Sequence, residues 1–183
     1  MDISVLVPIA HGTEELEAVA IVDIARRAGF RVLVCGESDN IICSRGIRIA
    51  PDRLWSDVDE SEQFDAVILP GGAEGTERFL QSEELRHIIL RHAADGALIG
   101  AICAAPVVLH HFGVLAPRCA VTSHPSVAEQ LRHYDYRTDR VVQSGRIITS
   151  RGAGTAVEFA LAIVAELAGP EHARTIAERI VAE

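Results

Sequence analysis

The chain has 183 residues and 49% of them are hydrophobic, enough for one sizeable core and little for two, so we expect a single domain over residues 1–183. The formal net charge of −9 gives nucleic-acid phosphates and anionic membranes no general attraction, and no specific nucleic-acid binding is expected. No apolar stretch approaches the roughly 20 residues of a membrane-spanning helix, and the N-terminus lacks the basic start of a signal peptide. We therefore expect a soluble cytoplasmic protein without a membrane partner.

The first half of the chain alternates apolar strands with helical segments. Strands are predicted at residues 3–9, 30–36, 64–72 and 97–103, and helices at residues 14–28, at 83–94 and from about Ala104. This alternation is typical of a parallel sheet covered by helices. Between the second and third strands, residues 41–52 contain two short β-rich arms, which predict a hairpin at the edge of the sheet.

The second half of the chain continues the sheet and ends in helices. Short strands are predicted at residues 119–123, 139–144 and 146–150, with a turn at Ser144-Gly145. A helix at about 154–167 is broken by Gly169-Pro170, and the apolar spacing of residues 171–183 predicts one more helix. The pattern as a whole predicts an α/β fold.

The four cysteines form neither a CxxC pair nor a cluster with histidine, which argues against structural zinc and against a disulfide framework. We expect reduced thiols at Cys35, Cys43, Cys103 and Cys119. Several histidines are predicted on helix surfaces without a third ligand at metal spacing, namely His87, His92, His110 and His111. No metal site is therefore predicted.

Cys103 ends an apolar strand and is followed by small residues and then by a predicted helix. Small neighbours allow the sharp strand-to-helix turn of a nucleophile elbow, which presents one side chain at the carboxyl edge of the sheet, where open α/β folds bind ligands. The N-terminus of the following helix is expected to lower the pKa of the thiol. The alternative is a buried cysteine that only fills space.

Glu17 lies in the first predicted helix, on a face that is otherwise apolar through Ala20, Ile21, Ile24 and Ala28. Burying an unpaired carboxylate is costly, so desolvation should raise the pKa of Glu17. The resulting acid could donate a hydrogen bond to a thiolate or move a proton. The alternative is an ordinary first-turn glutamate stabilised by the helix dipole, which is the role we expect for Glu14 and Glu15.

Two further features are expected at the same sheet edge. Pro70-Gly71-Gly72 ends a strand, so its amides could hold an oxyanion near Cys103, although a simple strand-ending turn would look the same. His124 follows another strand and could act as a base or polar contact, although a lone loop histidine is more often incidental. Neither a Rossmann nor a P-loop glycine motif is present, so no nucleotide cofactor is expected.

Four segments together resemble the ThiJ/PfpI superfamily in order and spacing: Glu14-Glu15-Leu16-Glu17, Val67 to Gly72, Ala101 to Pro106, and Thr149 to Gly152. The chain is similar to the branch of the parkinsonism-associated deglycase, and it resembles the bacterial chaperone-like YajL group as much as the human member. The resemblance covers nearly the whole chain. It implies a flavodoxin-like three-layer sandwich of the class I glutamine amidotransferase type, with a mostly parallel sheet, a homodimer and no cofactor.

The resemblance also implies roles for individual residues. Cys103 corresponds to the reactive, oxidisable cysteine and Glu17 to the acid hydrogen-bonded to it. Oxyanion-site amides are implied at Gly71, Gly72 and Ala104. A nearby catalytic or polar residue is implied at His124, and a substrate or oxyanion contact at Arg45. The resemblance implies that Arg45 approaches the pocket across the dimer, whose contact would form from the first helix and the 41–50 hairpin.

The activity implied by the resemblance is cofactor-free glyoxalase chemistry, which converts methylglyoxal to lactate, or deglycation of early aldehyde adducts, with a role in oxidative-stress protection. An alternative is a redox-sensing, holdase-like chaperone that acts through oxidation of Cys103 without turnover. A third possibility is a binding module on a flavodoxin-like fold, which would leave a buried Glu17 beside Cys103 unexplained.

Two positions depart from the pattern of the family. Ala50 stands where the human relative carries a second cysteine near the dimer contact, so redox roles of that thiol do not carry over, whereas Cys43 keeps its place. Ala104 stands where protease-like members place a histidine after the nucleophile. A peptidase would therefore lack its base, and proteolysis is not expected.

Overall fold

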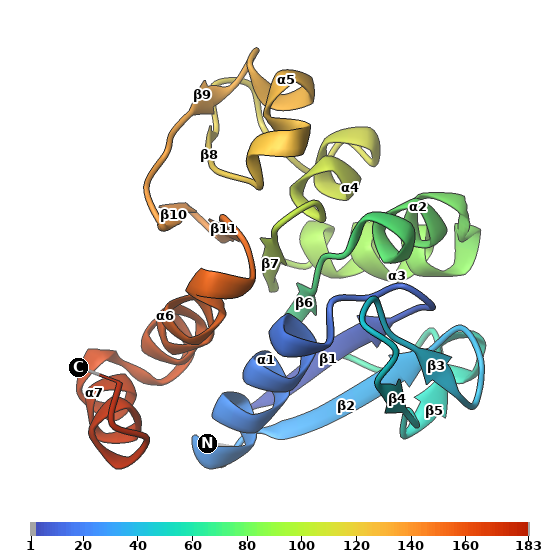
Figure 1. Cartoon of the computed structure of the whole chain (residues 1–183), viewed down its shortest axis with the longest axis horizontal. Coiled ribbons are helices and arrows are strands. Elements are labelled where there is room, and N and C mark those ends of the chain that lie inside the picture. Colours follow the sequence, from blue (N-terminus) through green and yellow to red (C-terminus); the bar gives the residue numbers. More distant parts are fainter. Residues whose placement is uncertain (1–2, 183) are drawn as a thin grey trace.

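The structure is a computed structural model that describes residues 3–182, and a seven-stranded sheet lies at its centre (Figure 1). The strand order is β10-β11-β7-β6-β1-β2-β5. The strands are β1 (Ser4–Ile9), β2 (Arg31–Gly36), β5 (Arg53–Leu54), β6 (Ala66–Leu69), β7 (Leu98–Ile102), β10 (Val141–Ser144) and β11 (Ile147–Ser150). All neighbouring strands in this sheet run parallel except β10 and β11, which form an antiparallel pair.

Continuous apolar runs form the middle of the sheet because helices cover both of its faces. In β1, Val5 and Val7 pack into one core while Leu6 packs into the other, and all three side chains are fully buried. Side chains alternate across a strand, so a strand buried on both faces needs an apolar residue at every position. This explains why the sequence shows runs rather than alternation.

Helices cover the sheet in two layers. On one face lie α1 (Glu15–Arg27), α6 (Ala156–Ala168) and α7 (Pro170–Arg179), and on the other lie α2 (Ala73–Gln81), α3 (Glu83–Ala94) and α4 (Pro106–His111) (Figure 1). This is the predicted three-layer α/β sandwich with a mostly parallel sheet. None of the helices among residues 3–182 combines the length and apolar character needed to cross a membrane.

The predicted 41–52 hairpin forms, but it does not extend the central sheet. Strands β3 (Ile41–Ile42) and β4 (Arg48–Ile49) make a separate two-stranded sheet, and Ile41 and Cys43 pack with Ile9, Ala18 and Val34. The edge of the central sheet is instead β5. The hairpin therefore covers the beginning of α1, at the carboxyl end of β1.

Other segments differ from the sequence prediction in extent. The predicted strand 119–123 is a short strand, β8 (Ala120–Val121), which pairs with β9 (Asp135–Tyr136) outside the central sheet, and α5 (Ala128–Leu131) lies between them. Single 3-10 turns occur at Trp55–Asp57, Pro125–Val127 and Ala153–Thr155. The last helix, predicted to reach residue 183, ends at Arg179, and residue 183 lies outside the described residues.

One predicted surface histidine is a core residue. His92 is fully buried, accepts a hydrogen bond from the Phe64 N–H at Nε2 over 3.2 Å, and faces the Ile88 carbonyl with Nδ1 at 2.8 Å. Burial lowers the pKa of His92, and the two contacts satisfy a neutral imidazole. The prediction of a solvated position for His92 was wrong, because this histidine ties α3 to the segment preceding β6.

Candidate active site

Cys103 occupies the sharp turn between β7 and α4. Its φ angle is 65°, in the left-handed region that a residue with a side chain rarely adopts. Two hydrogen bonds hold this backbone: the Cys103 N–H donates to the Ser150 carbonyl over 3.0 Å, and the Cys103 carbonyl accepts from the His124 N–H over 2.8 Å. Strain of this kind persists only where neighbours enforce it, and it is typical of a residue presented for chemistry.

Glu17 reaches the turn from α1, as the apolar face of that helix predicts. Its side chain is fully buried, and its Oε2 accepts a hydrogen bond from the Gly71 N–H over 2.7 Å. Its Oε1 has no hydrogen-bond partner of good geometry among residues 3–182, although the Cys103 thiol lies near enough to influence the carboxyl. A buried oxygen without a donor favours the protonated acid over the carboxylate.

The Glu17 carboxyl and the Cys103 thiol compete for a proton. Burial raises the pKa of Glu17 to about 7. Burial and the negative charge of Glu17 raise the pKa of the Cys103 thiol to about 12, while backbone N–H groups of Gly72 and Ala104 act in the opposite direction. The predicted lowering of the thiol pKa was therefore wrong, because burial and Glu17 outweigh the helix N-terminus. A thiolate is favoured only when Glu17 holds the proton.

The glycines after β6 are required by close packing. A Cβ atom on Gly71 would lie 2.6 Å from the Cys103 Cβ and 2.9 Å from the Glu17 Oε2. Gly72 has a φ angle of 96°, and a Cβ atom there would lie 2.1 Å from the Gly12 carbonyl oxygen. The Gly71 amide is already bonded to Glu17, so of the three predicted amides only those of Gly72 and Ala104, which lie near enough to the sulfur to lower the pKa of the thiol, remain for an oxyanion.

His124 lies beside Cys103 but is oriented by Ser126. Its Nδ1 is 2.8 Å from the Ser126 hydroxyl and accepts from the Ser126 N–H over 3.2 Å. Since Nδ1 accepts from a backbone N–H, the neutral ring carries its hydrogen on Nε2. Both Cys103 and His124 approach Gly152, where a Cβ atom would be 3.8 Å from the sulfur and 3.5 Å from the imidazole Cδ2.

A pocket of about 320 Å³ opens above the cysteine. It is lined by Gly12, Glu14, Ser44, Arg45, Gly72, Ala73, Glu74, Cys103, Ala104, His124 and Ser126. The structure thus brings together Cys103, His124, Gly72, Ala104 and Arg45, with Glu17 and Gly71 buried behind the sulfur. Arg45 reaches this pocket within its own chain, whereas its approach to the pocket of a second copy stays a prediction.

Several pocket residues were not found from the sequence. Ser44 and Glu14 meet through a hydrogen bond of 2.7 Å between positions 30 residues apart, which no local pattern encodes. Glu74 lies in the first turn of α2, a helix that was not predicted from the sequence. A usable signal existed only for Ser126, because Ser two residues after a histidine can bond to the imidazole locally.

Comparison with known proteins shows the family of this chain. The family model for the DJ-1/PfpI family matches residues 3–166, which is most of the chain. The chain belongs to the DJ-1/PfpI family. Protein dj-1beta of Drosophila melanogaster is 42% identical over 99% of this chain and 98% of its own length. The glutathione-independent glyoxalase DJR-1.2 of Caenorhabditis elegans is 40% identical over 89% of this chain and 87% of its own.

The family also accounts for the fold. The crystal structure of Drosophila melanogaster DJ-1beta superposes with a TM-score of 0.95 at 42% identity and covers all of both chains. The predicted flavodoxin-like sandwich is therefore confirmed, and so is the predicted place in the ThiJ/PfpI superfamily, in the branch of the parkinsonism-associated protein, which is the DJ-1 branch. The equal likeness to the bacterial YajL group stays a prediction, as do the catalytic roles of individual residues.

Proposed function

We propose that this protein is a cofactor-free glyoxalase that converts methylglyoxal to lactate with Cys103 as the nucleophile. The observation that carries the proposal is the pairing of a cysteine on a strained turn with a buried carboxyl whose pKa is raised to about 7. Groups with perturbed pKa values that face a pocket are typical of acid–base chemistry. The likeness to a relative named a glutathione-independent glyoxalase supports the same activity.

The proposed reaction begins when the Cys103 sulfur adds to the aldehyde carbon, forming a C–S bond while the carbonyl oxygen takes up a proton. Glu17 and His124 then move protons: one leaves the former aldehyde carbon to give an enediol, and one returns to the neighbouring carbon to give a lactoyl thioester. Water cleaves the C–S bond and releases lactate and the thiol. One carbon is oxidised as its neighbour is reduced, so the reaction needs no external oxidant.

The Gly72 and Ala104 amides have a definite part in this scheme. Both lie near the Cys103 sulfur and lower the pKa of its thiol, so an oxygen on the carbon attached to sulfur would be close to them. Preorganised N–H groups at developing negative charge typically account for about 10²–10³ in rate. The proposal therefore assigns the oxyanion site to these two amides, and assigns Gly71 to holding Glu17.

The test is methylglyoxal consumption with detection of lactate, comparing the unaltered protein with Cys103→Ala and Glu17→Gln. We expect Cys103→Ala to abolish turnover, and Glu17→Gln to lower kcat by about 10²-fold or more, since proton transfer typically contributes that much. Turnover that persists in Cys103→Ala would exclude the covalent mechanism. Deglycation of early aldehyde adducts is an alternative reaction for the same site. The same variants, assayed with glycated amines as substrate, would test it.

A second candidate function is redox sensing coupled to holdase-like chaperoning. It is favoured by the two amides at the sulfur, which could bind the oxygens of an oxidised Cys103, and by Glu17, which could donate to them. Of the four cysteines, Cys103 is the one that is only partly buried, so it is the thiol most open to an oxidant. Peroxide-dependent protection of a client protein without aldehyde turnover would favour this function over the glyoxalase.

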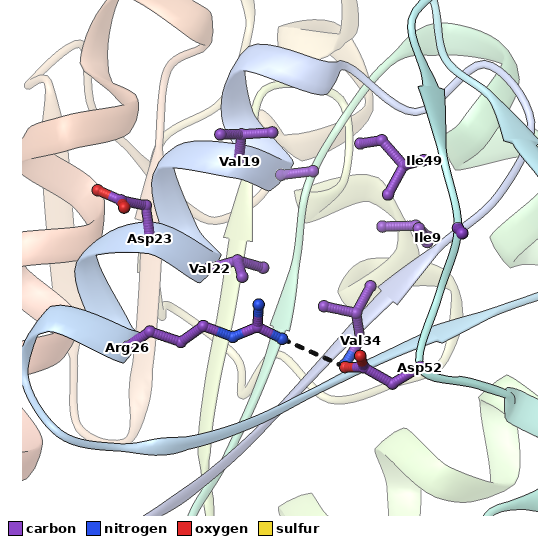
Figure 2. A pocket seen from close by; sticks show the side chains of 10 residues that line it. Ile9, Val19, Val22, Asp23, Arg26, Val34, Ile49 and Asp52 are labelled. Carbon is purple, nitrogen blue, oxygen red and sulfur yellow. Dashed lines mark hydrogen bonds and ion pairs between the residues drawn. The ribbon is translucent and has the colours of Figure 1, made fainter.

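We also propose that the protein acts as a homodimer. A groove of about 300 Å³ lies between α1 and the 48–52 segment, and Val19, Val22 and Ile49 line it together with Asp23 and the ion pair of Arg26 with Asp52 (Figure 2). Large apolar side chains are exposed on the same two elements, at Leu16 and Val19 of α1 and at Ile42 and Ile47 of the 41–50 hairpin. Exposed apolar groups that cluster on one face favour a protein partner. A second copy is the partner that the family resemblance implies.

A further inference from the structure

Glu15 is a buried carboxyl that the proposed reaction does not use. It is only 5% exposed at the beginning of α1, and its side chain points at the turn of the β3–β4 hairpin rather than into the pocket. Its oxygens accept hydrogen bonds from the Arg45 N–H over 2.9 Å, the Ser44 hydroxyl over 2.9 Å and the Ile47 N–H over 3.4 Å. The expectation of an ordinary first-turn glutamate was therefore wrong for Glu15.

Glu15 makes these contacts as a charged carboxylate. Burial alone would raise its pKa, but hydrogen bonds from its own backbone, Ser44, Ile47 and Arg45 outweigh burial and lower the pKa of Glu15. Hydrogen bonds to a charged acceptor are stronger than neutral ones. Glu15 thus differs from Glu17, two residues later on the helix, which lacks comparable donors and favours the protonated state.

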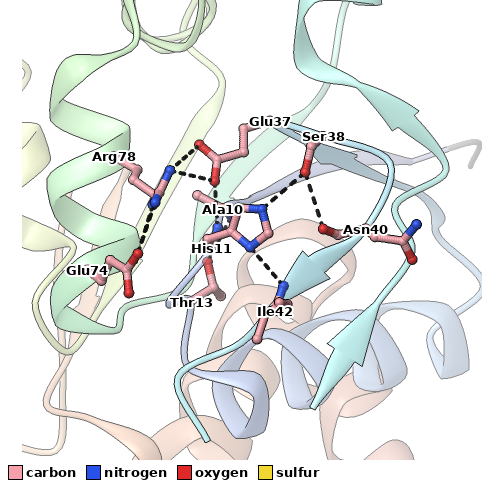
Figure 3. Close-up of polar contacts among 9 residues, drawn as sticks. All are labelled: Ala10, His11, Thr13, Glu37, Ser38, Asn40, Ile42, Glu74 and Arg78. Atoms are coloured by element: carbon pink, nitrogen blue, oxygen red, sulfur yellow. Dashed lines mark hydrogen bonds and ion pairs between the residues drawn. The ribbon is translucent and has the colours of Figure 1, made fainter. Parts of the chain in front are cut away.

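The turn bound by Glu15 carries two residues of the pocket wall, Ser44 and Arg45. The hairpin has only two residues in each strand and is not part of the central sheet, so little holds it internally. Its opposite end is attached by His11, whose Nδ1 accepts from the Ile42 N–H over 3.0 Å (Figure 3). At the pocket end, the Ser44 N–H donates to the Thr13 carbonyl over 2.8 Å, and Glu15 is the side chain that accepts from the next N–H groups of the turn, those of Arg45 and Ile47.

We propose that Glu15 is a positioning residue. It fixes the turn at Ser44–Ile47 so that the positive charge of Arg45 acts on molecules that approach Cys103. The role of Arg45 in substrate binding rests on the proposed function, whereas its electrostatic effect on Cys103 does not. A cation held beside a pocket attracts anionic reagents more than neutral ones. When the turn is released, the preference of Cys103 for anionic over neutral reagents should therefore fall, while the intrinsic reactivity of its sulfur stays the same.

The first test is alkylation of Cys103 by iodoacetate, which is anionic, and by iodoacetamide, which is neutral and of similar size. Glu15→Gln keeps the size of the side chain but turns an amide donor toward the N–H groups of the turn. We expect the ratio of the iodoacetate rate to the iodoacetamide rate to fall about threefold or more, the scale of one charge at short range in water. The rate with iodoacetamide should stay within about twofold of the unaltered protein.

The second test uses turnover. In Glu15→Gln the KM for methylglyoxal should rise about three- to tenfold with kcat little changed, because loosening a binding wall affects binding more than the chemical step. Combined with Arg45→Ala, Glu15→Gln should change neither KM nor the alkylation ratio further, since both act through the same guanidinium. If the protein turns over no aldehyde but the alkylation ratio still falls, the proposed function fails while the positioning role stands.

A matched control is Glu62→Gln. Glu62 also accepts several hydrogen bonds, from both terminal nitrogens of Arg53 and from the Asp59 N–H, but it contacts no residue of the pocket wall. This control should leave the alkylation ratio and KM unchanged. Should Glu15→Gln not fold, Glu15→Asp keeps the charge with a shorter reach and should lower the ratio in the same direction. An unchanged ratio in a folded Glu15 variant, or effects additive with Arg45→Ala, would overturn the positioning role.

Discussion

At the residue scale, Cys103 and Glu17 behave as one acid with two protons. Loss of the first proton leaves a single negative charge that either the carboxylate or the thiolate can carry. A neutral side chain in place of Glu17 removes the negative charge that, together with burial, raises the pKa of the Cys103 thiol, so the thiol should then lose its proton at a lower pH. Since the pKa of Glu17 is raised to about 7, the first proton of the pair should be lost near that pH.

The measurement is the rate of Cys103 alkylation by iodoacetamide as a function of pH. In the unaltered protein the rate should rise only well above pH 7, because the ionised Glu17 carboxylate opposes loss of the thiol proton, and Glu17→Gln should shift that rise to lower pH, because glutamine carries no charge. Cys43 serves as an internal control because its side chain is only 4% exposed, so limited access of the reagent should keep it from reacting. If the two profiles coincide, the thiol titrates independently of Glu17.

Sequence reasoning found Glu17 but misread Glu15, for a physical reason. Helical spacing places Glu17 on the apolar face of α1, so its burial follows from periodicity. The environment of Glu15 depends on the turn 30 residues later, which folds over the helix through contacts that no local pattern records. The predicted pKa of the Cys103 thiol failed similarly, because the prediction weighed the helix N-terminus without the burial and charge that only the packed structure supplies.

At the element scale, the strands buried on both faces were predictable and the short peripheral ones were not. Runs such as residues 3–9 allow little besides a central strand, because every position must be apolar. In contrast, β5 and β9 have two residues each, too few to form a pattern. Helix α2 was missed because a glycine and several polar residues interrupt its apolar face, and its position is set by packing around Thr13 and Phe79.

Gly100 in β7 offers a test of how tightly the central element is packed. A Cβ atom there would lie 2.8 Å from the Ile68 Cδ1 and 3.1 Å from the Phe159 ring. Gly100→Ala should therefore lower the free energy of unfolding by about 1–3 kcal/mol, the usual cost of overpacking a core. Urea unfolding measures this change.

The control for Gly100→Ala is Gly154→Ala. No atom lies within 4 Å of a Cβ placed on Gly154, and its backbone is not in the left-handed region. We expect its free energy of unfolding to change by less than about 1 kcal/mol, with a gain possible because alanine restricts the unfolded chain. Equal stability of the two variants would show that Ile68 and Phe159 rearrange without cost around the extra methyl group.

At the scale of the whole molecule, the three-layer arrangement explains why the site lies where it does. The carboxyl ends of β1, β6 and β7 meet at one edge of the sheet, and the segments that follow them supply Gly12, Gly72 and Cys103. Open α/β sheets bind ligands at this edge. The β3–β4 hairpin contributes Arg45 to the pocket, and α1 contributes Glu17 behind it. The same two elements also border the groove of the proposed dimer contact.

The proposed dimer is tested by Val19→Asp. Val19 is 53% exposed in the structure and lines the groove, so aspartate there costs the single chain little but would bury a charge between two copies. The matched control is Val157→Asp, because Val157 is 39% exposed in the first turn of α6, away from the groove.

By size-exclusion chromatography with light scattering, the unaltered protein and the control should have the mass of a dimer. Val19→Asp should raise the dissociation constant at least tenfold, equivalent to about 1.4 kcal/mol or more. A monomeric mass for the unaltered protein at high concentration would remove the dimer, and with it any contribution of Arg45 to a second pocket.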